Sequence, residues 1–500
     1  MTKLNLLKTL CAALLLTLAV HTSAQIEVDK RHTYDIYGVL KKTNNHLYTF
    51  NQVNKTFDKK ELIIYDLSGE KLNRIELQSR VGYDLIQGLT VGDGSLFCLR
   101  MKTMLLMIQV DADGNETFRK EFEYGKFSDV KLYAYDNGFF LTSEVKVKKV
   151  GTGVRIERLD GEFNSQWTFD HIPEKGKHFH RLTAMAPDGK VSFVYEIGNS
   201  EKYKAITVNT SGEMMSDVEF NNNSLSDVEP YRAYYSGTNE LTIIADAGAT
   251  NNTVFMKMAT TLLVNTIDVA SGTETSSQKL SFKAVQEEVG DKREDGGLVY
   301  PEAPALRVVD VQKINGQNTF ICESYLMKER SESVRATSSS TTATVVSFKQ
   351  IAMMDLYLLN ASNLSAGIRR IWKPKRTLEM DGLTYTTSVR YCNLLEENNL
   401  FSYQFIQNDN IVVRGFSQNY EYINWIPVGA SHDGVLTRKY WGEPISNKRG
   451  TSNFTQTFRT SSVGNKPNIN RDGLLQLSDG FILYHYDGIT NELELSFNKN

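Results

Sequence analysis

The chain has 500 residues, of which 41% are hydrophobic and 23% are charged, and its formal net charge at pH 7 is −3. This composition provides enough apolar material for a large core. Because the charge is nearly balanced, the chain has no general attraction to nucleic acid or to a membrane surface, and we expect neither as a partner. With only 9 prolines and 34 glycines, the chain is also unlike a disordered or fibrous polymer.

Residues 1–24 have the pattern of a secretory signal peptide. Two lysines precede an apolar stretch from Leu10 to Val20, and small residues follow up to Ala24. The apolar stretch is shorter than the ~20 residues that a membrane-spanning helix requires, and no later stretch is longer. We therefore expect an exported chain that begins at Gln25, has no transmembrane segment, and resides in the periplasm, at the cell surface or outside the cell.

The mature chain would keep three cysteines, Cys98, Cys322 and Cys392. An odd and sparse set without paired spacing does not fit a disulfide framework or a thiolate metal cage. Each cysteine lies in an apolar or aromatic run, so we expect all three to be small buried hydrophobic residues.

A tight turn recurs along the chain between two β-rich runs. Each instance contains residues such as Asn, Asp or Gly, which tolerate the positive φ angles of tight hairpins. A run rich in aromatic and β-branched residues, typical of a strand, follows each turn. The eight positions are 43–45, 92–94, 136–138, 187–189, 236–238, 315–316, 397–399 and 478–480.

A second turn follows the first in every repeat and joins the next pair of strands. Each repeat therefore reads as strand A, tight turn, strand B, longer loop, strand C, tight turn, strand D. Four strands in each of about eight repeats is the pattern of propeller blades. The second turns are at 65–70, 110–115, 158–161, 208–212, 268–272, 359–362, 486–488 and, in a weaker form, 415–419.

The sequence predicts an all-β fold, a single β-propeller domain over residues 25–500 with about eight four-stranded blades, or alternatively seven. The last repeat has only three strands, so we expect Gln25–Asp29 to supply the fourth strand and close the ring. Closure would remove two exposed sheet edges. A pair of β-sandwiches is the alternative fold, but sandwiches do not require one two-turn rhythm along the whole chain.

The later repeats are longer than the first ones. Successive first turns are roughly 45 to 50 residues apart in the first five repeats and roughly 80 apart in the last three intervals. We expect loop insertions at 284–304, 328–349 and 427–470, all on the face that carries the B–C and D–A loops. Loops on a rigid scaffold are where binding groups concentrate, so this long-loop face is the predicted binding face.

The insertion at 427–470 has the densest mixture of charged and aromatic residues. Aromatic side chains beside polar groups suit a sugar ring or a peptide, although a long loop also uses aromatic residues to fix its own conformation. The candidate ligand-binding residues are His432, Asp433, Arg438, Tyr440, Trp441 and Glu443.

The local motifs of several enzyme classes are missing from the sequence: G-x-S-x-G, G-x-x-x-x-G-K-[ST], H-E-x-x-H and G-x-G-x-x-G. We therefore predict no cofactor and no metal site, and we assign no catalytic residue. Asp111, Asp113 and Asn115 have the spacing of a calcium loop, but they occupy the position of an ordinary second turn. His178 and His180 have the spacing of a zinc pair, but we expect them in a solvated loop.

Three functional hypotheses remain, of which the weakest is a structural part of a larger assembly. The favoured one is an exported, non-enzymatic binding or scaffold protein that recognises a protein, peptide or glycan on the long-loop face. The alternative is a carbohydrate-active hydrolase or lyase with paired carboxylates over the central channel, because carboxylates from distant blades leave no local motif. The candidate carboxylates are Glu287, Asp295, Asp433 and Glu443.

The signal peptide, the turn rhythm and the sparse cysteines together resemble the uncharacterised secreted β-propeller-like proteins of bacteria. The resemblance spans most of the mature chain and is architectural. The Trp-Asp dipeptide of WD40 blades, the S-x-D-x-G-x-T-W box of sialidases and a Tyr-Trp-Thr-Asp motif are all missing. The resemblance therefore implies a fold and no functional residue.

Overall fold

The computed structural model describes most of the chain. The described residues are 22–27, 40–52, 59–78, 82–125, 127–147, 151–172, 178–197, 202–220, 224–253, 256–289, 304–335, 343–371, 376–381, 386–397, 401–416, 421–429, 437–440, 455–459, 471–478, 480–487 and 492–499. They fall into two compact units, Met1–Lys146 with Arg155–Asp170 and Lys466–Asn500, and Val147–Val154 with His171–Asn465.

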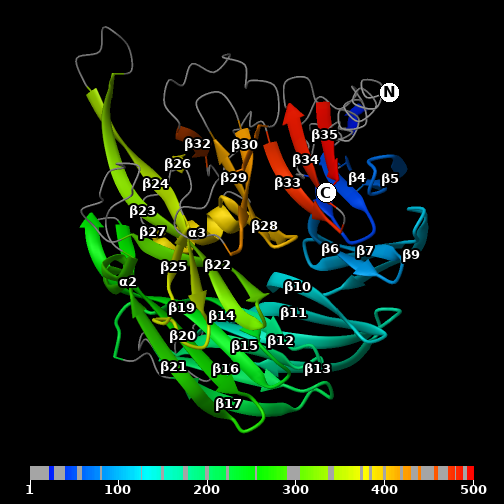
Figure 1. Cartoon of the computed structure of the whole chain (residues 1–500). Helices are drawn as coiled ribbons and strands as arrows, with labels where there is room; N and C mark the ends of the chain where they lie inside the picture. Colours follow the sequence, from blue (N-terminus) through cyan, green and yellow to red (C-terminus); the bar gives the residue numbers. More distant parts are fainter. Residues whose placement is uncertain are drawn as a thin grey trace, which may run out of the picture. The chain divides into compact units, whose positions relative to one another are not determined.

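The first unit contains four groups of four strands, and successive strands of each group pair antiparallel (Figure 1). Val147, Gly151–Val154 and His171, at the ends of three of its strands, belong to the second unit. The sheets are β2 (Lys41–Lys42), β3 (Leu47–Gln52), β4 (Lys59–Tyr65) and β5 (Lys71–Gln78); β6 (Asp84–Val91), β7 (Gly94–Met101), β8 (Met104–Val110) and β9 (Glu116–Glu123); β10 (Phe127–Tyr135), β11 (Gly138–Val147), β12 (Gly151–Asp160) and β13 (Ser165–His171); and β33 (Arg471–Leu477), β34 (Gly480–Asp487), β35 (Glu492–Lys499) and β1 (Thr22–Glu27).

The second unit contains four further groups of four strands. They are β14 (His178–Met185), β15 (Val191–Ile197), β16 (Lys202–Val208) and β17 (Met214–Phe220); β18 (Glu229–Tyr235), β19 (Glu240–Thr253), β20 (Met256–Asp268) and β21 (Thr273–Ser281); β22 (Ala305–Ile314), β23 (Gln317–Arg335), β24 (Ala343–Asn360) and β25 (Arg369–Ile371); and β28 (Tyr403–Gln407), β29 (Asn410–Phe416), β30 (Glu421–Pro427) and β31 (Thr437–Tyr440). The remaining described elements are α2 (Phe282–Val289), β26 (Arg376–Asp381), β27 (Thr386–Thr387), α3 (Ser388–Glu397) and β32 (Thr455–Arg459).

The described strands therefore make eight four-stranded blades, which we number one to seven in chain order from β2, with β33–β35 and β1 as blade eight. Within each unit, successive blades pack face to face. Leu47 and Ile63 of blade one pack with Ile482 and Leu495 of blade eight. Comparable apolar clusters join blades one to three, and, in the second unit, blades four to seven. The predicted all-β β-propeller class is confirmed, with eight blades rather than seven.

In four blades, the second turn is stabilised by an Asp or Asn side chain that accepts hydrogen bonds from two backbone N–H groups of the turn. In the first blade, Oδ1 of Asp66 accepts the N–H groups of Ser68 and Glu70, both at 2.8 Å, and Gly69 has a φ of +89°. Asp111, Asp160 and Asn209 make the same pair of bonds in the next three blades. Asp111, with its calcium-like spacing, is therefore part of a hairpin turn, as predicted.

The N-terminal strand supplies the fourth strand of blade eight, as predicted. β1 pairs antiparallel with β35, from Thr22 opposite Phe497 to Glu27 opposite Glu492. The strand begins at Thr22 rather than at Gln25, so it spans the predicted cleavage position. Asp29, the predicted end of this strand, lies outside the described residues.

The turn predicted at 397–399 is wrong, because a helix ends there. α3 covers Ser388–Glu397, and Val389, Cys392 and Leu395 are buried at every third position, which is a helical spacing. The apolar residues before the paired asparagines therefore belong to a helix and not to a strand.

The true first turn of blade seven lies between β28 and β29. Asn408 and Asp409 have positive φ angles of 47° and 56°, as a tight hairpin requires. Gly415 and Phe416, predicted to begin the second turn, are instead the last two residues of β29, and 417–419 lie outside the described residues. In blade eight, Tyr486 and Asp487, also predicted as part of a second turn, are instead the last residues of β34, the second strand, and Gly488 lies outside the described residues.

The insertions are also more ordered than predicted. Most of 328–349 is strand, because β23 and β24 continue as a hairpin that pairs from Lys328 opposite Gln350 to Arg335 opposite Ala343 (Figure 1). The Thr-Val-Val run at 344–346 favours a strand despite the Ser/Thr-rich composition around it. Part of 284–304 is α2, and 427–470 contains β31 and β32. Within the described part of the chain, no helix has the length and hydropathy needed to cross a membrane.

Candidate functional site

Two of the six predicted ligand-binding residues lie in a described strand. Arg438 and Tyr440 occupy alternate positions of β31, opposite Asn424 and Tyr422 of β30. β31 is the last strand of blade seven, at the opposite edge of the sheet from β28. His432, Asp433, Trp441 and Glu443 lie outside the described residues, so a ligand site in this insertion stays a prediction.

The predicted carboxylates are not brought together among the described residues. Glu287 is exposed on α2, where its Oε1 lies 3.7 Å from Nζ of Lys283, one helical turn away. Asp295, like Asp433 and Glu443, lies outside the described residues.

The histidine pair is in a strand and not in a loop. His178 begins β14, and His180 is buried, with Nε2 at 3.0 Å from both the carbonyl oxygen of Leu182 and Oγ1 of Thr183. The expectation of a solvated loop at these positions is therefore wrong.

The three cysteines are free and buried, as predicted. Burial raises the pKa of the Cys98 thiol and of the Cys392 thiol to about 12. These thiols are therefore protonated and unreactive near neutral pH while the surrounding structure is closed.

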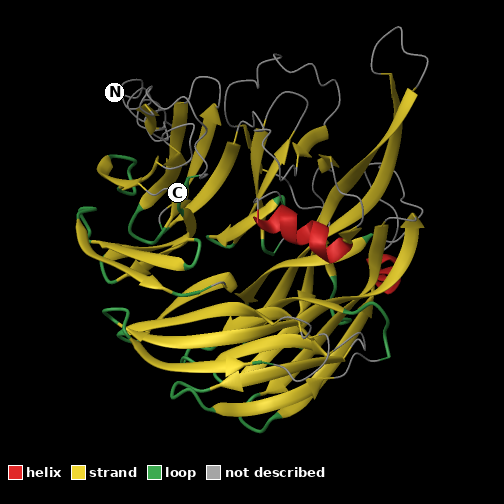
Figure 2. Ribbon diagram, turned by 180° about the vertical axis from the view of Figure 1, so that it is seen from behind, coloured by secondary structure: helices red, strands yellow, loops and turns green. Residues whose placement is uncertain are grey.

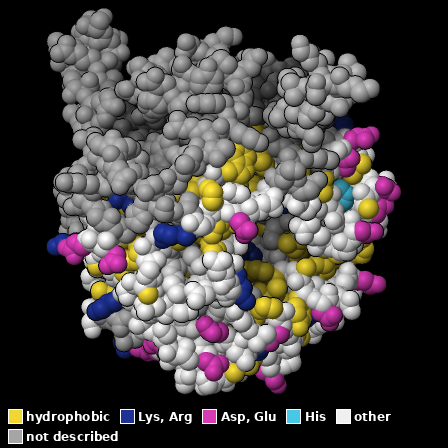
Figure 3. All heavy atoms as spheres, in the orientation of Figure 1, with side chains coloured by type: hydrophobic (Ala, Val, Ile, Leu, Met, Phe, Trp, Pro, Cys, Tyr) yellow, Lys and Arg dark blue, Asp and Glu magenta, His cyan; other side chains and the backbone are white. Residues whose placement is uncertain are grey.

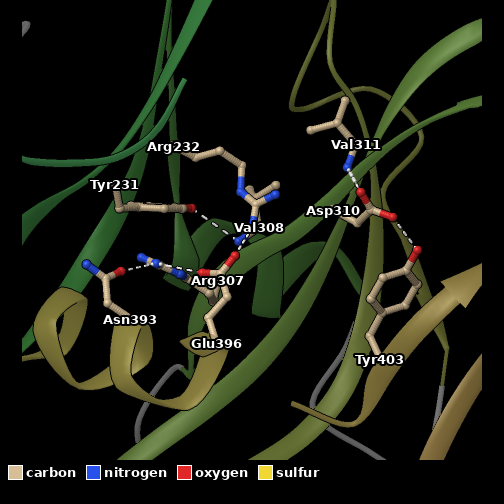
Figure 4. Close-up of polar contacts among 9 residues, drawn as sticks. All are labelled: Tyr231, Arg232, Arg307, Val308, Asp310, Val311, Asn393, Glu396 and Tyr403. Atoms are coloured by element: carbon tan, nitrogen blue, oxygen red, sulfur yellow. Dashed lines mark hydrogen bonds and ion pairs between the residues drawn. The ribbon is translucent and has the colours of Figure 1, made fainter. Parts of the chain in front are cut away.

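A polar cluster that we did not predict lies in the second unit, centred on Arg307 of β22 (Figure 4). The Arg307 side chain is 0% exposed. Its guanidinium carbon lies 3.6 Å from the ring centre of Tyr231, and the Tyr231 hydroxyl accepts the backbone N–H of Val308 at 3.1 Å. We call Tyr231, Arg232, Asp246, Arg307, Asn393 and Glu396 the Arg307 cluster.

Helix α3 supplies the polar partners of Arg307. Its Asn393 and Glu396 side chains point toward the guanidinium, and Nη2 of Arg307 donates to Oδ1 of Asn393 and, at 3.2 Å, to Oε2 of Glu396 (Figure 4). The helix packs against β18, β20 and β27. Figure 2 shows it as the longer of the two red helices. A buried charge on β22 therefore holds a helix that is not part of the blade pattern.

Glu396 joins two arginines. Its Oε1 pairs with Nη2 of Arg232 from β18, while Oε2 faces Arg307 from β22. The side chains of Arg232 and Glu396 are 24% and 39% exposed. The carboxylate therefore links blades five and six, and this ion pair reaches solvent.

Asp246 is the second carboxyl group of the cluster. It lies in β19, is 2% exposed, and stands directly opposite Glu229 of β18 in the strand register. Burial raises the pKa of the Asp246 carboxyl to about 7; nearby Arg307 opposes the rise and Glu229 adds to it. This carboxyl group therefore titrates near neutral pH.

A second pair of carboxylates attaches blade seven to blade six. The fully buried Glu323 of β23 accepts the backbone N–H groups of Ser402 at 2.9 Å and Tyr403 at 3.2 Å. The Tyr403 hydroxyl points to Asp310 of β22 and donates to it (Figure 4). Asp310 also accepts the N–H of Val311 at 2.8 Å. Burial, and then Asp310, raise the pKa of Tyr403 strongly.

These donors and acceptors come from the first two strands of blades five and six, from α3 and from the start of blade seven. Elsewhere, the described surface in Figure 3 has acidic and basic side chains interspersed, and neither sign forms a continuous patch there. One sequence signal was available: Arg307 and Glu323 are charged residues inside apolar strand runs, Ala305–Val309 and Phe320–Tyr325. Charges in such positions are seldom buried unless they are paired.

No family model and no curated protein matches the chain. Similar solved structures include the WD40 domain of SCAP from fission yeast, which is 11% identical with a TM-score of 0.42, over 96% of this chain and 98% of that one. A puromycin-hydrolysing peptidase of Mycobacterium tuberculosis is 9% identical with a TM-score of 0.38, over 92% of this chain and 59% of the peptidase.

Dihydro-heme d1 dehydrogenase NirN, in complex with DHE, is 12% identical with a TM-score of 0.37, over 96% of this chain and 78% of that one. These three proteins differ in activity, and all three similarities are at identities close to a tenth. No ligand, partner or catalytic residue is carried over from them.

Proposed function

We propose that this chain is an exported binding or scaffold protein that recognises a protein, peptide or glycan, and that the Arg232–Glu396 ion pair is part of the recognition surface. The observation that carries the proposal is the position of Glu396, half-exposed beside Arg232 and held from below by the fully buried Arg307. Polar groups fixed before the ligand arrives cost less ordering entropy on binding.

Folding stability explains the arrangement of Arg307, Glu396 and Arg232 less well than ligand binding does. Exposed ion pairs contribute little to folding. A buried charge costs several kcal/mol of desolvation, and an apolar residue of similar volume often stabilises a protein as well or better. Here a fully buried arginine is used to hold Asn393 and Glu396 of α3. The clearest consequence of burying Arg307 is that the Glu396 carboxylate has a fixed position at the surface.

The chemistry of the surface fits a ligand with both donors and acceptors. Arg232 offers guanidinium N–H groups and Glu396 offers carboxylate oxygens, so peptide groups and sugar hydroxyls both match. The predicted residues of the 427–470 insertion, above all Trp441 and Tyr440, would add aromatic contacts for a sugar ring or a peptide side chain.

A binding screen tests the proposal. The purified chain from Gln25 onward is applied to glycan and peptide arrays, and the best ligand is titrated against variants. We expect Arg232→Ala and Trp441→Ala each to weaken binding about tenfold, the effect of removing one well-placed contact. Lys204→Ala is the matched control, because Lys204 forms an ion pair of similar exposure with Asp217 on the outer strands of blade four.

The two variants test two sets of ligand contacts separately, those of the Arg307 cluster and those of the 427–470 insertion. Unchanged binding by Arg232→Ala would remove the Arg307 cluster from the recognition surface, and unchanged binding by both variants would contradict the proposal. If a bound glycan is cleaved during the titration, the carbohydrate-active alternative is correct instead.

Export has its own test. The full chain is expressed in a bacterial host, and the intact mass of the exported protein is measured. We expect the mass of a chain that begins at Gln25, because small residues end at Ala24 after the apolar stretch. Such a chain keeps only Gln25–Glu27 of β1. A protein that is recovered in the cytoplasm with residues 1–24 attached would contradict export.

A further inference from the structure

Two asparagines of the chain are followed by glycine, Asn137 and Asn315. Such a pair can lose the asparagine side-chain amide, because the backbone nitrogen of the next residue can reach the side-chain carbonyl carbon and glycine has no Cβ to obstruct the approach. Asparagine is accordingly among the thermolabile residues. The reaction requires a backbone nitrogen that is free to move, and the two pairs differ in this respect.

Asn315 and Gly316 form the whole two-residue turn between β22 and β23, and both are exposed. Ile314 and Gln317 pair across the turn, and Asn315 and Gly316 have positive φ angles of 50° and 80°, as in a type I′ turn. The hydrogen bond across such a turn joins the two flanking residues. In the described part of the chain, the N–H of Gly316 has no hydrogen-bond partner, and a Cβ at this glycine would have no atom within 4 Å beyond its chain neighbours. The nitrogen of Gly316 is therefore free to move toward the Asn315 side chain.

Gly138 is in a different position, because it is the first residue of β11 and not a central residue of its turn. It pairs with Tyr135, so its N–H is the one that donates across the two-residue turn. Gly138 is also buried, and a Cβ at this glycine would lie 2.3 Å from the carbonyl oxygen of Leu159 in β12. The nitrogen of Gly138 can approach the Asn137 side chain only after this end of β11 opens.

We propose that Asn315 is a site of spontaneous covalent modification, and that it converts to aspartate and isoaspartate through a cyclic imide with Gly316. The backbone nitrogen of Gly316 loses its proton and attacks Cγ of Asn315; a C–N bond forms, the bond from Cγ to Nδ2 breaks, and ammonia leaves. Water then opens the ring on either side of the shared nitrogen. Opening at Cγ gives aspartate, and opening at the main-chain carbonyl carbon gives isoaspartate. Either product adds a negative charge to the tip of the hairpin, and neither depends on a ligand.

A time course of the folded chain tests the proposal. The purified chain is incubated at mildly alkaline pH, and the peptides that contain Asn137 and Asn315 are quantified by mass spectrometry. We expect Asn315 to react about tenfold faster than Asn137, because a hydrogen bond must break before Gly138 can react, and one such bond corresponds to about this factor. The same incubation in concentrated urea is the control, since neither turn is formed there and the two sites should react at equal rates.

The products identify the mechanism. The peptide from an Asn315→Asp variant is the chromatographic reference for the aspartate product, so isoaspartate is recognised as a second product of the same mass. Direct hydrolysis of the side-chain amide gives aspartate alone, whereas opening of the cyclic imide gives both products. Equal rates at the two sites in the folded chain, a difference that persists in urea, or aspartate without isoaspartate would each overturn the proposal.

Discussion

Replacing Arg307 by alanine is expected to lower the free energy of unfolding by about 3 kcal/mol, as truncation of a large buried side chain usually does. The substitution empties the space of a fully buried side chain, removes the contact with the Tyr231 ring and releases Asn393 and Glu396 of α3. The measurement is a urea titration at pH 7 followed by circular dichroism, with the midpoint compared between variant and native chain.

Arg307→Met is the matched control, since it keeps most of the volume and removes the charge. We expect it to stay within about 1.5 kcal/mol of the native chain, because Glu396, the ion-pair partner of Arg307, is partly exposed and keeps its pair with Arg232, so this carboxylate is not left buried and unpaired. The methionine variant should nevertheless lose the ligand affinity that depends on a fixed Glu396. Equal destabilisation by alanine and methionine would show that the charge, and not the volume, stabilises this part of the fold.

Replacing Glu323 by alanine is expected to cost about 3 kcal/mol of stability. The carboxylate of Glu323 accepts two buried backbone N–H groups, those of Ser402 and Tyr403, and each orphaned donor costs about 1–3 kcal/mol. Glu323→Gln keeps one acceptor oxygen and should lose about half as much. The same urea titration measures both variants.

The control for Glu323 is a carboxylate in a surface ion pair. Glu116 of β9 pairs with Arg119 at 2.6 Å, and both side chains are partly exposed. Glu116→Ala should change stability by no more than about 0.5 kcal/mol. If Glu323→Ala is as mild as this control, the two hydrogen bonds do not hold blade seven to blade six.

The comparison of prediction and structure separates local from long-range information. The turns at 65–70 and 110–115 were predictable, because one aspartate satisfies the backbone of residues two and four positions later and a glycine supplies the positive φ. The turn at 397–399 was wrong, although paired asparagines also favour turns. There, the helical spacing of the buried residues before them decided the local structure.

The hairpin at 328–349 shows a second limit of local reasoning. Its Ser/Thr-rich composition is typical of a loop, yet β23 and β24 pair along most of it. Two strands that already pair within blade six can continue their register outward, so each added pair costs little loop entropy. Composition does not contain that information, because it comes from the neighbouring strand.

By itself, the sequence determined an all-β architecture of about eight four-stranded blades, with seven as the alternative, and the N-terminal strand that completes the last blade, because strands and tight turns depend on residues within a few positions of one another. Only the tertiary structure decided the Arg307 cluster. Arg232, Asp246, Arg307 and Glu396 come from three strands and one helix, and Arg232 lies 164 positions from Glu396. The spacing of residues in the sequence cannot predict that these charged side chains lie together, because burial and the packing of successive blades bring them together.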